Sequence, residues 1–524
     1  MPWTLLESGM TALRFCLWLI VYSLGGGVSF AAFAQDTKIQ QACEQFASRP
    51  FAEVKIVASQ VVSSGQIVNL NQPITYVGQS FCRLEGFIDA DIGFELWLPA
   101  PDQWNQRLLT GGVGGQAGSF NYQIAHRGVQ RGYATATTDS GHKVADVHWL
   151  LMKGRQAENY AERAHHLLAV KAKEMMHAYY GTFPKHAFFI GCSGGGRQAL
   201  TEVQRYPLDY DGVIAGAPGV NTPEMSARRL WEMKQHSEWG SLMTQKHWDW
   251  VAKEARKQCD ASDGVINGLT ENPRQCRFNV STMACTTQRT EVCLTPSQIA
   301  AVEKIHAPLT DEVGVPIDGG LPYGVRITAD PLPEPFTPGP RYLAVVLFSE
   351  GIYRDPNWDV SNFKISRDLK LIDQVMNLHA DDPNLDLFRD AGGKLILYHG
   401  WTDQLVSPYS TLAYQESLLV RYGSQALDHF SRLYMVPGMD HCRGGEGADQ
   451  FGGMGNDGPV IDSNNDMLTA LEHWVLKGES PHDLFASRIA NGNVERTHRL
   501  CSYPKTAKYI GFGSPLVHTN YRCE

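Results

Sequence analysis

Two kinds of hydrophobic pattern occur in the first half of the chain. Residues 81–100 (FCRLEGFIDADIGFELWLPA) alternate apolar and polar positions, which predicts antiparallel strands. Residues 186–192 (HAFFIGC) and 210–218 (YDGVIAGAP) contain short apolar runs of the kind that forms buried strands. Residues 158–181 have a helical pattern, and we expect this helix to end at Gly181.

Strands that alternate with helices predict an α/β fold, with a mostly parallel sheet flanked by helices. The alternation stops near Val220, and it returns with the apolar strand pattern KLILYHG at 394–400. The intervening stretch is rich in Trp, Pro and short polar clusters, and its length suits a separate unit. We therefore expect a leader at 1–34, a core at 35–219 and 386–524, and an inserted domain at 220–385.

The N-terminus has the pattern of a secretory signal peptide. Arg14 precedes the apolar run FCLWLIVYSLGGGVSF, and Ala32-Phe33-Ala34 offers a cleavage site before Gln35. A membrane anchor is the alternative, but the run is short and is interrupted by three glycines. No later segment reaches transmembrane length, so we expect a mature protein that is secreted or periplasmic and leaves the membrane after cleavage.

Composition narrows the class of protein only slightly. The chain of 524 residues is 43% hydrophobic and 19% charged, as expected for a folded globular protein with more than one unit. Its net charge of -9 argues against a nucleic-acid-binding protein, which would need a basic surface.

The strongest chemical motif is Gly191-Cys192-Ser193-Gly194-Gly195, a G-x-S-x-G between an apolar strand and a helix. A serine at such a turn projects above the sheet as a nucleophile. The small neighbours avoid clashes in the tight turn, and the helix that follows directs its N-terminal N–H groups at the site. We therefore predict that Ser193 is a nucleophile, although a bystander serine in a glycine-rich turn has the same local sequence.

A serine nucleophile needs a base and an orienting acid, and on this fold they follow it in the order acid, then His. Asp403 follows the strand KLILYHG, and His441 follows the strand RLYMVPGMD. We predict that His441 is the base and that Asp403 orients it. Other candidates remain at this point, and they are the acids Asp440 and Asp139 and the histidines His399 and His142.

The predicted oxyanion hole needs two backbone N–H donors. Gly194, directly after the nucleophile, would supply one of them. The glycine-rich loop Gly112-Val113-Gly114-Gly115 follows the strand RLLT, and we choose Gly115 as the second donor. A flexible glycine loop without a catalytic duty is the alternative.

Ten cysteines remain after the predicted cleavage, and an even number in an exported chain predicts disulfides. Sequence proximity favours the pairs Cys259–Cys276, Cys285–Cys293 and Cys501–Cys523. Cys192 is adjacent to Ser193 and Cys442 is adjacent to His441, so a bond between these two cysteines would tie the predicted base to the predicted nucleophile.

The segment from Asp260 to Leu269 (DASDGVINGL) contains two carboxylates, an amide oxygen and glycine turns. Oxygen donors in this arrangement suit a hard cation, chiefly calcium. The spacing differs from an EF-hand, and an ordinary polar turn is the alternative.

Together these motifs resemble the tannase and feruloyl esterase family, which includes mono(hydroxyethyl) terephthalate hydrolase. The similarity extends over nearly the whole mature chain, from about Cys43 to Cys523. The most specific elements are the three predicted catalytic residues with their flanking cysteines, supported by the segments YDGVIAGAPG, CDASDGVINGL, LILYHGWTD and VPGMDHC.

The resemblance implies an α/β-hydrolase core with an inserted lid that contains a structural calcium ion and no organic cofactor. Its implied calcium ligands are Asp260, Asp263, the Val265 carbonyl, Asn267 and the Leu269 carbonyl. Family members usually have Asp where this chain has Asn267, which removes one charge and weakens the expected affinity. The implied disulfides are Cys192–Cys442, Cys43–Cys82, Cys259–Cys276, Cys285–Cys293 and Cys501–Cys523.

The resemblance also implies a serine esterase acting on esters of feruloyl, galloyl or terephthaloyl type, either small molecules or esters on a plant polymer. Aromatic residues of the lid would cover the acyl ring, and the candidates are Tyr353, Trp358 and Phe363. For each of them, packing in the core of the lid is the alternative. Two alternatives remain, an amidase or peptidase on the same fold and a non-catalytic secreted protein that binds ligands in the lid cleft.

Overall fold

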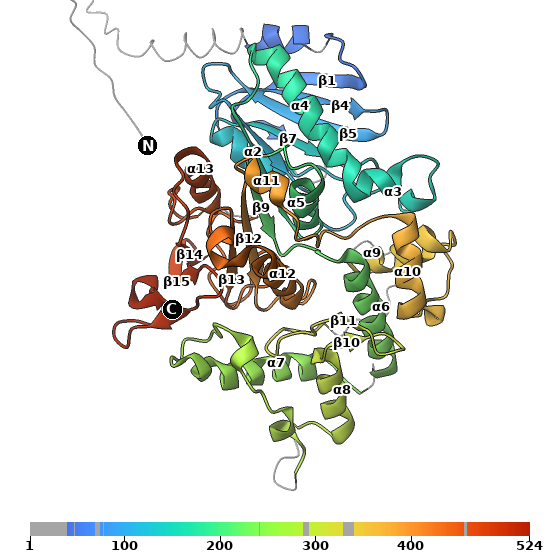
Figure 1. Ribbon diagram of the computed structural model, residues 1–524, viewed down its shortest axis with the longest axis vertical. Coiled ribbons are helices and arrows are strands. Elements are labelled where there is room, and N and C mark those ends of the chain that lie inside the picture. Colours follow the sequence, from blue (N-terminus) through green and yellow to red (C-terminus); the bar gives the residue numbers. More distant parts are fainter. Residues whose placement is uncertain are drawn as a thin grey trace, which may run out of the picture.

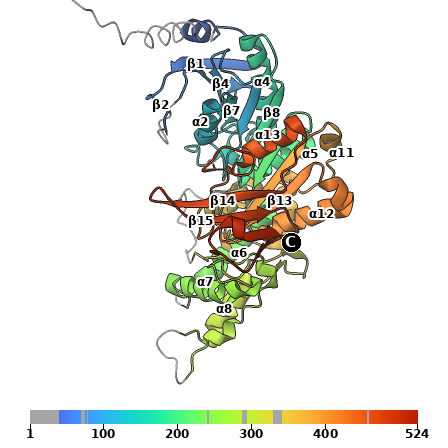
Figure 2. The same ribbon diagram turned by 90° about the vertical axis from the view of Figure 1, so that its left-hand side faces the viewer.

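The computed structural model describes residues 39–46, 48–68, 74–76, 78–239, 242–286, 293–328, 340–454 and 458–524. The predicted signal peptide lies outside the described residues. Figures 1 and 2 show a large central sheet with helices on both faces and a mainly helical segment at one end.

The central sheet has nine strands in the order β1-β4-β5-β7-β6-β8-β9-β12-β13. The pairs from β1 to β7 are antiparallel, and those from β7 to β13 are parallel. The expectation of a mostly parallel sheet with antiparallel strands at 81–100 is therefore confirmed. The strands are β1 (Val54–Val62), β4 (Phe81–Ile88), β5 (Ile92–Pro99), β6 (Arg107–Gly111), β7 (Ala134–Thr138), β8 (His186–Cys192), β9 (Gly212–Gly216), β12 (Lys394–Gly400) and β13 (Ser431–Val436).

Helices cover both faces of this sheet because successive residues of each buried strand point to opposite sides. Leu395 and Leu397 of β12 belong to one hydrophobic cluster, whereas Ile396 and Tyr398 belong to another. The first cluster packs against α4 (Ala164–Tyr180), α5 (Gly194–Arg205) and α12 (Pro408–Leu427), and the second packs against α2 (Tyr122–Gln130) and α13 (Met467–Lys477).

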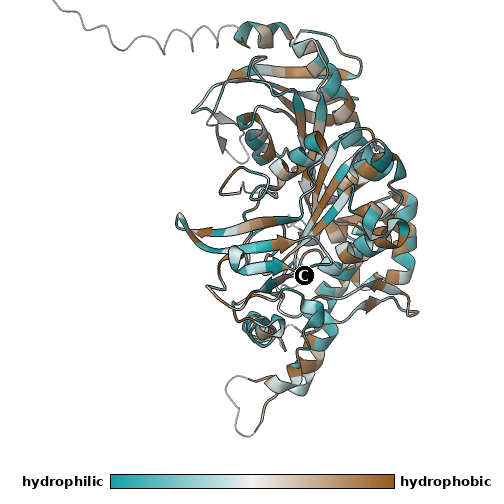
Figure 3. Cartoon of the chain, turned by 60° about the vertical axis from the view of Figure 1, so that its left-hand side comes forward, coloured by the Kyte–Doolittle hydropathy of each residue, from teal (hydrophilic) through white to brown (hydrophobic). Residues whose placement is uncertain are grey.

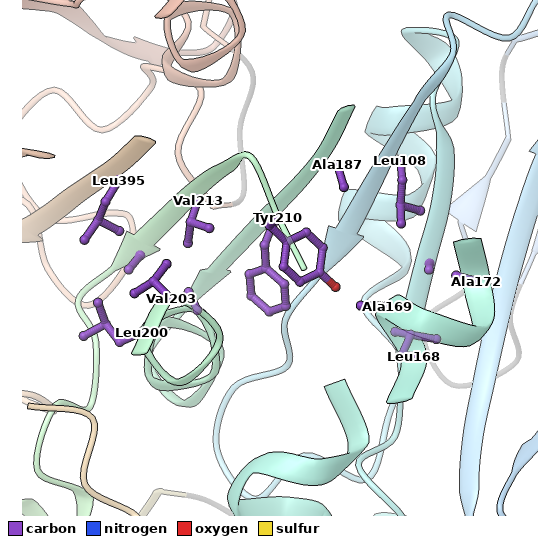
Figure 4. Close-up of a cluster of buried hydrophobic side chains, with 14 of the residues drawn as sticks. Leu108, Leu168, Ala169, Ala172, Ala187, Leu200, Val203, Tyr210, Val213 and Leu395 are labelled. Atoms are coloured by element: carbon purple, nitrogen blue, oxygen red, sulfur yellow. The ribbon is translucent and has the colours of Figure 1, made fainter. Parts of the chain in front are cut away.

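Figure 4 shows part of the first cluster, between the sheet and the helices α4 and α5. Leu108, Ala187 and Val213 project from neighbouring strands towards Leu168 of α4 and Leu200 of α5. In Figure 3 the central strands are largely hydrophobic, whereas the surrounding helices alternate between hydrophilic and hydrophobic residues, as expected for helices that bury one face.

The helix expected at 158–181 is interrupted near its start. It consists of the short α3 (Gln156–Glu158), a π-helical turn at Asn159–Arg163 and α4, which ends at Gly181 in a left-handed conformation. The π-helical turn was not expected, because no local sequence signal marks it.

The segment 220–385 lies beyond one end of the sheet (Figure 1). One of its hydrophobic clusters, which includes Trp248 and Val302, contains only residues of this segment, whereas another also includes Trp149 and Tyr160 of the core. Its elements are α6 (Thr222–Trp239), α7 (Gln245–Asp260), α8 (Pro296–His306), β10 (Leu309–Thr310), β11 (Pro316–Asp318), α9 (Pro340–Val346) and α10 (Ile365–Val375). We call this segment the lid, and its exact boundaries stay a prediction.

The chain ends in small antiparallel pairs that pack beside β13. These are β14 (Asp483–Ala490) with β15 (Asn493–Cys501) and β16 (Ala507–Tyr509) with β17 (Tyr521–Cys523). A short helix, α11 (Asp386–Asp390), leads into β12, and a separate pair, β2 (Ile67–Val68) with β3 (Ile74–Thr75), follows β1. Among the described helices, none is long and apolar enough to cross a bilayer.

Candidate active site

Ser193 occupies the turn between β8 and α5, as the motif predicts. Its backbone has φ 63° and ψ -123°, a conformation that non-glycine residues rarely adopt. Its N–H donates to the Gly216 carbonyl of the neighbouring strand at 2.9 Å, and its side chain makes no capping bond to the helix. The hydroxyl is therefore left available for chemistry.

The glycines around Ser193 are required by close backbone contacts. A Cβ built on Gly191 would lie 2.3 Å from the Gly195 carbonyl oxygen, and one on Gly196 would lie 2.5 Å from the Gly216 carbonyl oxygen. These distances are far below van der Waals contact, so a larger residue at either position would displace the turn.

His441 and Asp403 come together from the loops that follow β13 and β12. The Nδ1 atom of His441 lies 2.7 Å from the Asp403 Oδ2 atom, and His441 retains 19% exposure while Asp403 has none. The other carboxylate oxygen of Asp403 accepts the N–H groups of Leu405 at 2.8 Å and Val406 at 3.0 Å. Asp403 is thus held rigidly and oriented towards His441.

A second histidine stabilises Asp403. His399 is fully buried on β12, and its Nε2 atom lies 3.1 Å from Asp403 Oδ2 while its Nδ1 atom lies 2.8 Å from the Thr411 hydroxyl. Burial opposes ionisation of Asp403, but the pairing with His441 and the hydrogen bonds of both histidines hold the pKa of this carboxyl below its usual range. The carboxylate therefore stays ionised beside His441.

The alternative acid Asp139 and the alternative histidine His142 have other partners. Asp139 accepts the N–H groups of Gly93 and Gly141 at 2.9 Å and pairs with Lys143. His142 lies 2.8 Å from the Gln116 carbonyl through Nε2 and stacks on Trp149, and burial lowers its pKa.

A disulfide joins the two residues next to Ser193 and His441. The Cα atoms of Cys192 and Cys442 are 6.1 Å apart, although 250 positions separate them in the sequence. The other bonds are the pairs that the resemblance implies, namely Cys43–Cys82, Cys259–Cys276, Cys285–Cys293 and Cys501–Cys523.

Ser193 and His441 line one cavity of about 360 Å³ between the core and the lid. This volume is typical of small-molecule sites, which range from about 300 to 1,000 Å³. The cavity's wall is mainly apolar, and its described residues include two arginines and no carboxylate. It consists of Gly114, Gly115, Gln123, Tyr160, Cys192, Ser193, Gly194, Gly219, Thr222, Met225, Arg229, Leu343, Leu405, Val406, His441, Cys442, Arg443 and Met454.

The two predicted oxyanion donors lie against each other in this cavity. A Cβ on Gly194 would meet the nitrogen of Gly115 at 3.2 Å, so the α5 N-terminus and the glycine loop are in close contact. Gly115 has φ 60°, which favours glycine, and neither of the two N–H groups has a hydrogen-bond partner among the described residues. Both N–H groups are therefore available to an oxygen at Ser193.

The three lid aromatics chosen from the sequence do not line this cavity. Tyr353 stacks on Trp358 with ring centroids 4.9 Å apart, and its hydroxyl donates to Asp368 at 2.5 Å. Phe363 packs edge-on against Phe348 in the hydrophobic cluster that the lid shares with Trp149 and Tyr160 of the core. The lid contributes Thr222, Met225 and Arg229 from α6 and Leu343 from α9 to the cavity wall instead.

Sequence reasoning missed the cavity-lining residues of α6 and α9, together with Tyr160. The spacing of Thr222, Met225 and Arg229 by three and four positions places them on one helix face, which was a detectable signal. No signal in the sequence could have shown that this face, rather than the opposite one, points at Ser193.

The segment 260–269 forms a compact loop at the end of α7. Asp260 accepts the N–H groups of Asn267 and Gly268 at 2.9 Å, and Asp263 accepts that of Val265 at 3.3 Å. Asn267 accepts the Leu269 N–H at 2.9 Å and donates to the Tyr521 hydroxyl at 2.8 Å. The loop thus gathers the predicted calcium ligands in one place and connects them to the C-terminal strands.

Charges of both signs lie at this loop, since Arg496 donates to the Asn267 carbonyl at 2.8 Å and His498 lies 2.7 Å from Glu271. Asp263 is crowded with Asp260 and Glu271, and its pKa is raised to about 6, first by burial and then by these two negative charges. Within the described parts of the chain, no three His, Cys, Asp or Glu side chains form a metal-binding cluster. The predicted site uses two carboxylates, one amide oxygen and two carbonyls, a donor set suited to calcium.

The sheet, the strand–turn–helix at Ser193 and the similarity to solved esterases define a protein with the α/β-hydrolase fold. The chain belongs to the tannase and feruloyl esterase family, whose model matches residues 76–326 and 344–524. It is accordingly a carboxylic ester hydrolase.

Individual relatives span almost the full length of the chain. An uncharacterised esterase of Xanthomonas campestris is 31% identical over 94% of this chain and 93% of its own length. Feruloyl esterase B of Aspergillus niger is 28% identical over 94% and 97%. The crystal structure of feruloyl esterase B from Aspergillus oryzae covers 93% of this chain and 100% of its own, with TM-score 0.86 and 26% identity.

Proposed function

We propose that the protein is a secreted serine esterase that cleaves esters of aromatic carboxylic acids through an acyl-serine intermediate. The observation that carries this proposal is the cavity that Ser193 and His441 both line, with His441 hydrogen-bonded to the buried Asp403. Family membership supports ester hydrolysis, and the relatives described as feruloyl esterases support an aromatic acyl group.

The first half of the reaction forms the acyl-enzyme. His441 takes the proton of Ser193 as its oxygen attacks the ester carbonyl, and Asp403 stabilises the imidazolium that results. The negative oxygen of the tetrahedral intermediate accepts the N–H groups of Gly194 and Gly115. The intermediate then collapses, the C–O bond to the alcohol breaks, and His441 returns the proton to the departing alcohol.

The second half repeats these steps with water. His441 removes a proton from a water molecule, whose oxygen attacks the acyl carbonyl of Ser193. The same two N–H groups hold the second oxyanion, and collapse releases the carboxylic acid and restores the Ser193 hydroxyl. These proton transfers need no organic cofactor.

Export is part of the proposal. Five disulfides are typical of an oxidising compartment, and the N-terminal sequence has the signal-peptide pattern. Expression in a bacterium with and without residues 1–34, followed by fractionation, tests export; retention of the full-length chain in the cytoplasm would contradict it.

A substrate panel tests the acyl preference. We expect kcat/KM for methyl ferulate, methyl gallate or a terephthalate monoester to exceed that for methyl 3-cyclohexylpropanoate by at least about tenfold, because the relatives described as feruloyl esterases favour a site shaped for a flat aromatic acyl group. Equal values for the aromatic and saturated acyl groups would remove the aromatic class. An anilide of the same aromatic acid tests the amidase alternative. An amidase should turn over the anilide and the ester at comparable rates, whereas an esterase should strongly prefer the ester.

We also propose that the loop 260–269 binds a structural calcium ion through Asp260, Asp263, Asn267 and the carbonyls of Val265 and Leu269. The ion would neutralise the crowded carboxylates and fasten the end of α7 to the C-terminal strands through Asn267 and Tyr521. It takes no part in the ester chemistry, since none of these residues lines the cavity beside Ser193.

Calcium removal should therefore lower thermal stability. We expect the Tm of the chelator-treated protein to rise by several degrees when calcium is added, because an ion that binds the folded state and not the unfolded state stabilises the folded state. Asp263→Asn should abolish this rise. The matched control is Asp311→Asn in the β10–β11 turn, where the carboxylate likewise accepts backbone N–H groups; it should keep the rise. A calcium-independent Tm in the wild-type protein would contradict the site.

A further inference from the structure

The loop that supplies the Gly115 N–H is held by hydrogen bonds to three of its own successive carbonyl groups. The Gly114 carbonyl accepts the Ala117 N–H at 3.1 Å, and the Gly115 carbonyl accepts the Tyr160 hydroxyl at 2.9 Å. The Gln116 carbonyl lies 2.8 Å from His142 Nε2. The carbonyl groups of Gly114, Gly115 and Gln116 thus each have a hydrogen-bond donor of their own.

Packing against the N-terminus of α5 leaves the cavity side of Gly115 open. A Cβ built on Gly115 would have no heavy atom within 4 Å, so the loop faces open space on its cavity side. A glycine with φ 60° also has wide conformational freedom. The orientation of the Gly115 peptide groups therefore depends on the hydrogen bonds to their carbonyls, and among the donors only Tyr160 also lines the cavity.

Tyr160 is itself tied to the helix that begins at Ser193. It lies in the π-helical turn Asn159–Arg163, a distortion that often marks functional positions. Arg197 of α5 donates to the carbonyls of Tyr160 at 2.8 Å and Ala161 at 2.6 Å, and its guanidinium lies 4.9 Å from the Tyr160 ring centroid. The Arg197 N–H in turn donates to the Ser193 carbonyl at 2.9 Å.

These contacts form a continuous connection across the oxyanion hole, from Ser193 through Arg197 and Tyr160 to Gly115. We propose that Tyr160 is a positioning residue, whose hydroxyl holds the Gly115 N–H in place relative to the Gly194 N–H. This inference rests on the proposed function of the site. Tyr160 is 2% exposed, and burial raises its pKa, so its hydroxyl remains a donor throughout the range in which an esterase works.

The variant Tyr160→Phe removes the hydroxyl and keeps the ring. Loss of a whole oxyanion donor slows enzymes about 10²- to 10³-fold, so a misplaced donor should lower kcat by at least about tenfold. KM should stay within about twofold, because the ring wall is retained. Inhibition by an aryl boronate, which forms a tetrahedral anion on Ser193, should weaken by the same factor as kcat/KM, whereas inhibition by the planar carboxylate product should not change.

Tyr180→Phe is the matched control. Tyr180 ends the same helical run, and its hydroxyl also donates to a backbone carbonyl at 2.9 Å, that of Pro99. Tyr180→Phe therefore loses the same kind of hydrogen bond, from a tyrosine hydroxyl to a backbone carbonyl. Because Tyr180 does not line the cavity, this variant should keep the wild-type kcat and boronate inhibition. Rates are normalised to the Ser193 that an organophosphonate titrates, so that unfolded protein is not counted.

Each outcome decides one claim. Unchanged normalised kcat and boronate inhibition in Tyr160→Phe would overturn the positioning role, and so would a rise in KM with kcat unaltered, which indicates a substrate contact. Equal losses in Tyr160→Phe and Tyr180→Phe would show a general effect on stability and also overturn it. Failure of the phosphonate to label Ser193 in the wild-type protein would instead refute the proposed function.

Discussion

Ser193→Ala should reduce ester hydrolysis by about 10⁴-fold or more, because it removes the hydroxyl that attacks the ester carbonyl. The measurement is kcat on the best ester of the panel, together with mass-spectrometric detection of phosphonate labelling. The labelled mass should disappear with the hydroxyl. Tm should stay within a few degrees of the wild-type value, since the Ser193 side chain makes no capping bond and alanine accepts its backbone no worse than serine.

The chain offers a close control for this variant. Ser140 also follows a strand of the sheet, has φ 64° and lies 3.5 Å from a histidine, His165, but it is fully buried. Ser140→Ala should leave kcat within about threefold of the wild type, because Ser140 lines no part of the cavity. Ester turnover that survived in Ser193→Ala and vanished in Ser140→Ala would reverse the assignment of the nucleophile.

Replacing Cys192 and Cys442 together by alanine should destabilise the protein more than the loss of any other disulfide. The bond closes a loop of 250 residues, for which the chain-entropy argument gives about 5.5 kcal/mol. Catalysis should fall as well, since the bond positions His441 relative to Ser193. Urea unfolding, scored by its midpoint, measures the first effect, and kcat per titrated Ser193 measures the second.

The pair Cys285–Cys293 provides the comparison. It closes only 8 residues in the lid, so its removal should cost about 2.5 kcal/mol by the same argument and leave kcat unaffected. Equal shifts in the urea midpoint for the two double variants would contradict the dependence on loop length. An unchanged kcat in the Cys192/Cys442 variant would show that packing alone positions His441.

Several features followed from short stretches of sequence. The turn at Ser193 was predictable because an apolar run and closely spaced glycines determine a strand, a tight turn and a helix within about fifteen residues. Asp403 and His441 were found from chain order and from their places after apolar strands. The structure pairs His441 with the buried Asp403 and places His441 in the wall of the cavity that Ser193 also lines, which agrees with that order.

Other features had no local signal. That His399 also pairs with Asp403 depends on the packing of β12 against α12, through the bond to Thr411. Tyr353 and Trp358 were candidates to cover the acyl ring, with packing inside the lid as the alternative, and in the structure they stack on each other and do not line the cavity. Their aromatic side chains indicated that they pack against other rings, but the sequence did not indicate whether they point towards the cavity.

The sequence by itself determined the class of fold, the identity and order of the proposed catalytic groups, and the presence of the calcium-type loop, because strand, turn and helix preferences act over a few neighbouring residues. Only the tertiary structure decided which face of α6 meets Ser193 and which hydroxyl holds Gly115. Those contacts join residues tens to hundreds of positions apart, and they depend on how the lid and the π-helical turn pack against the sheet.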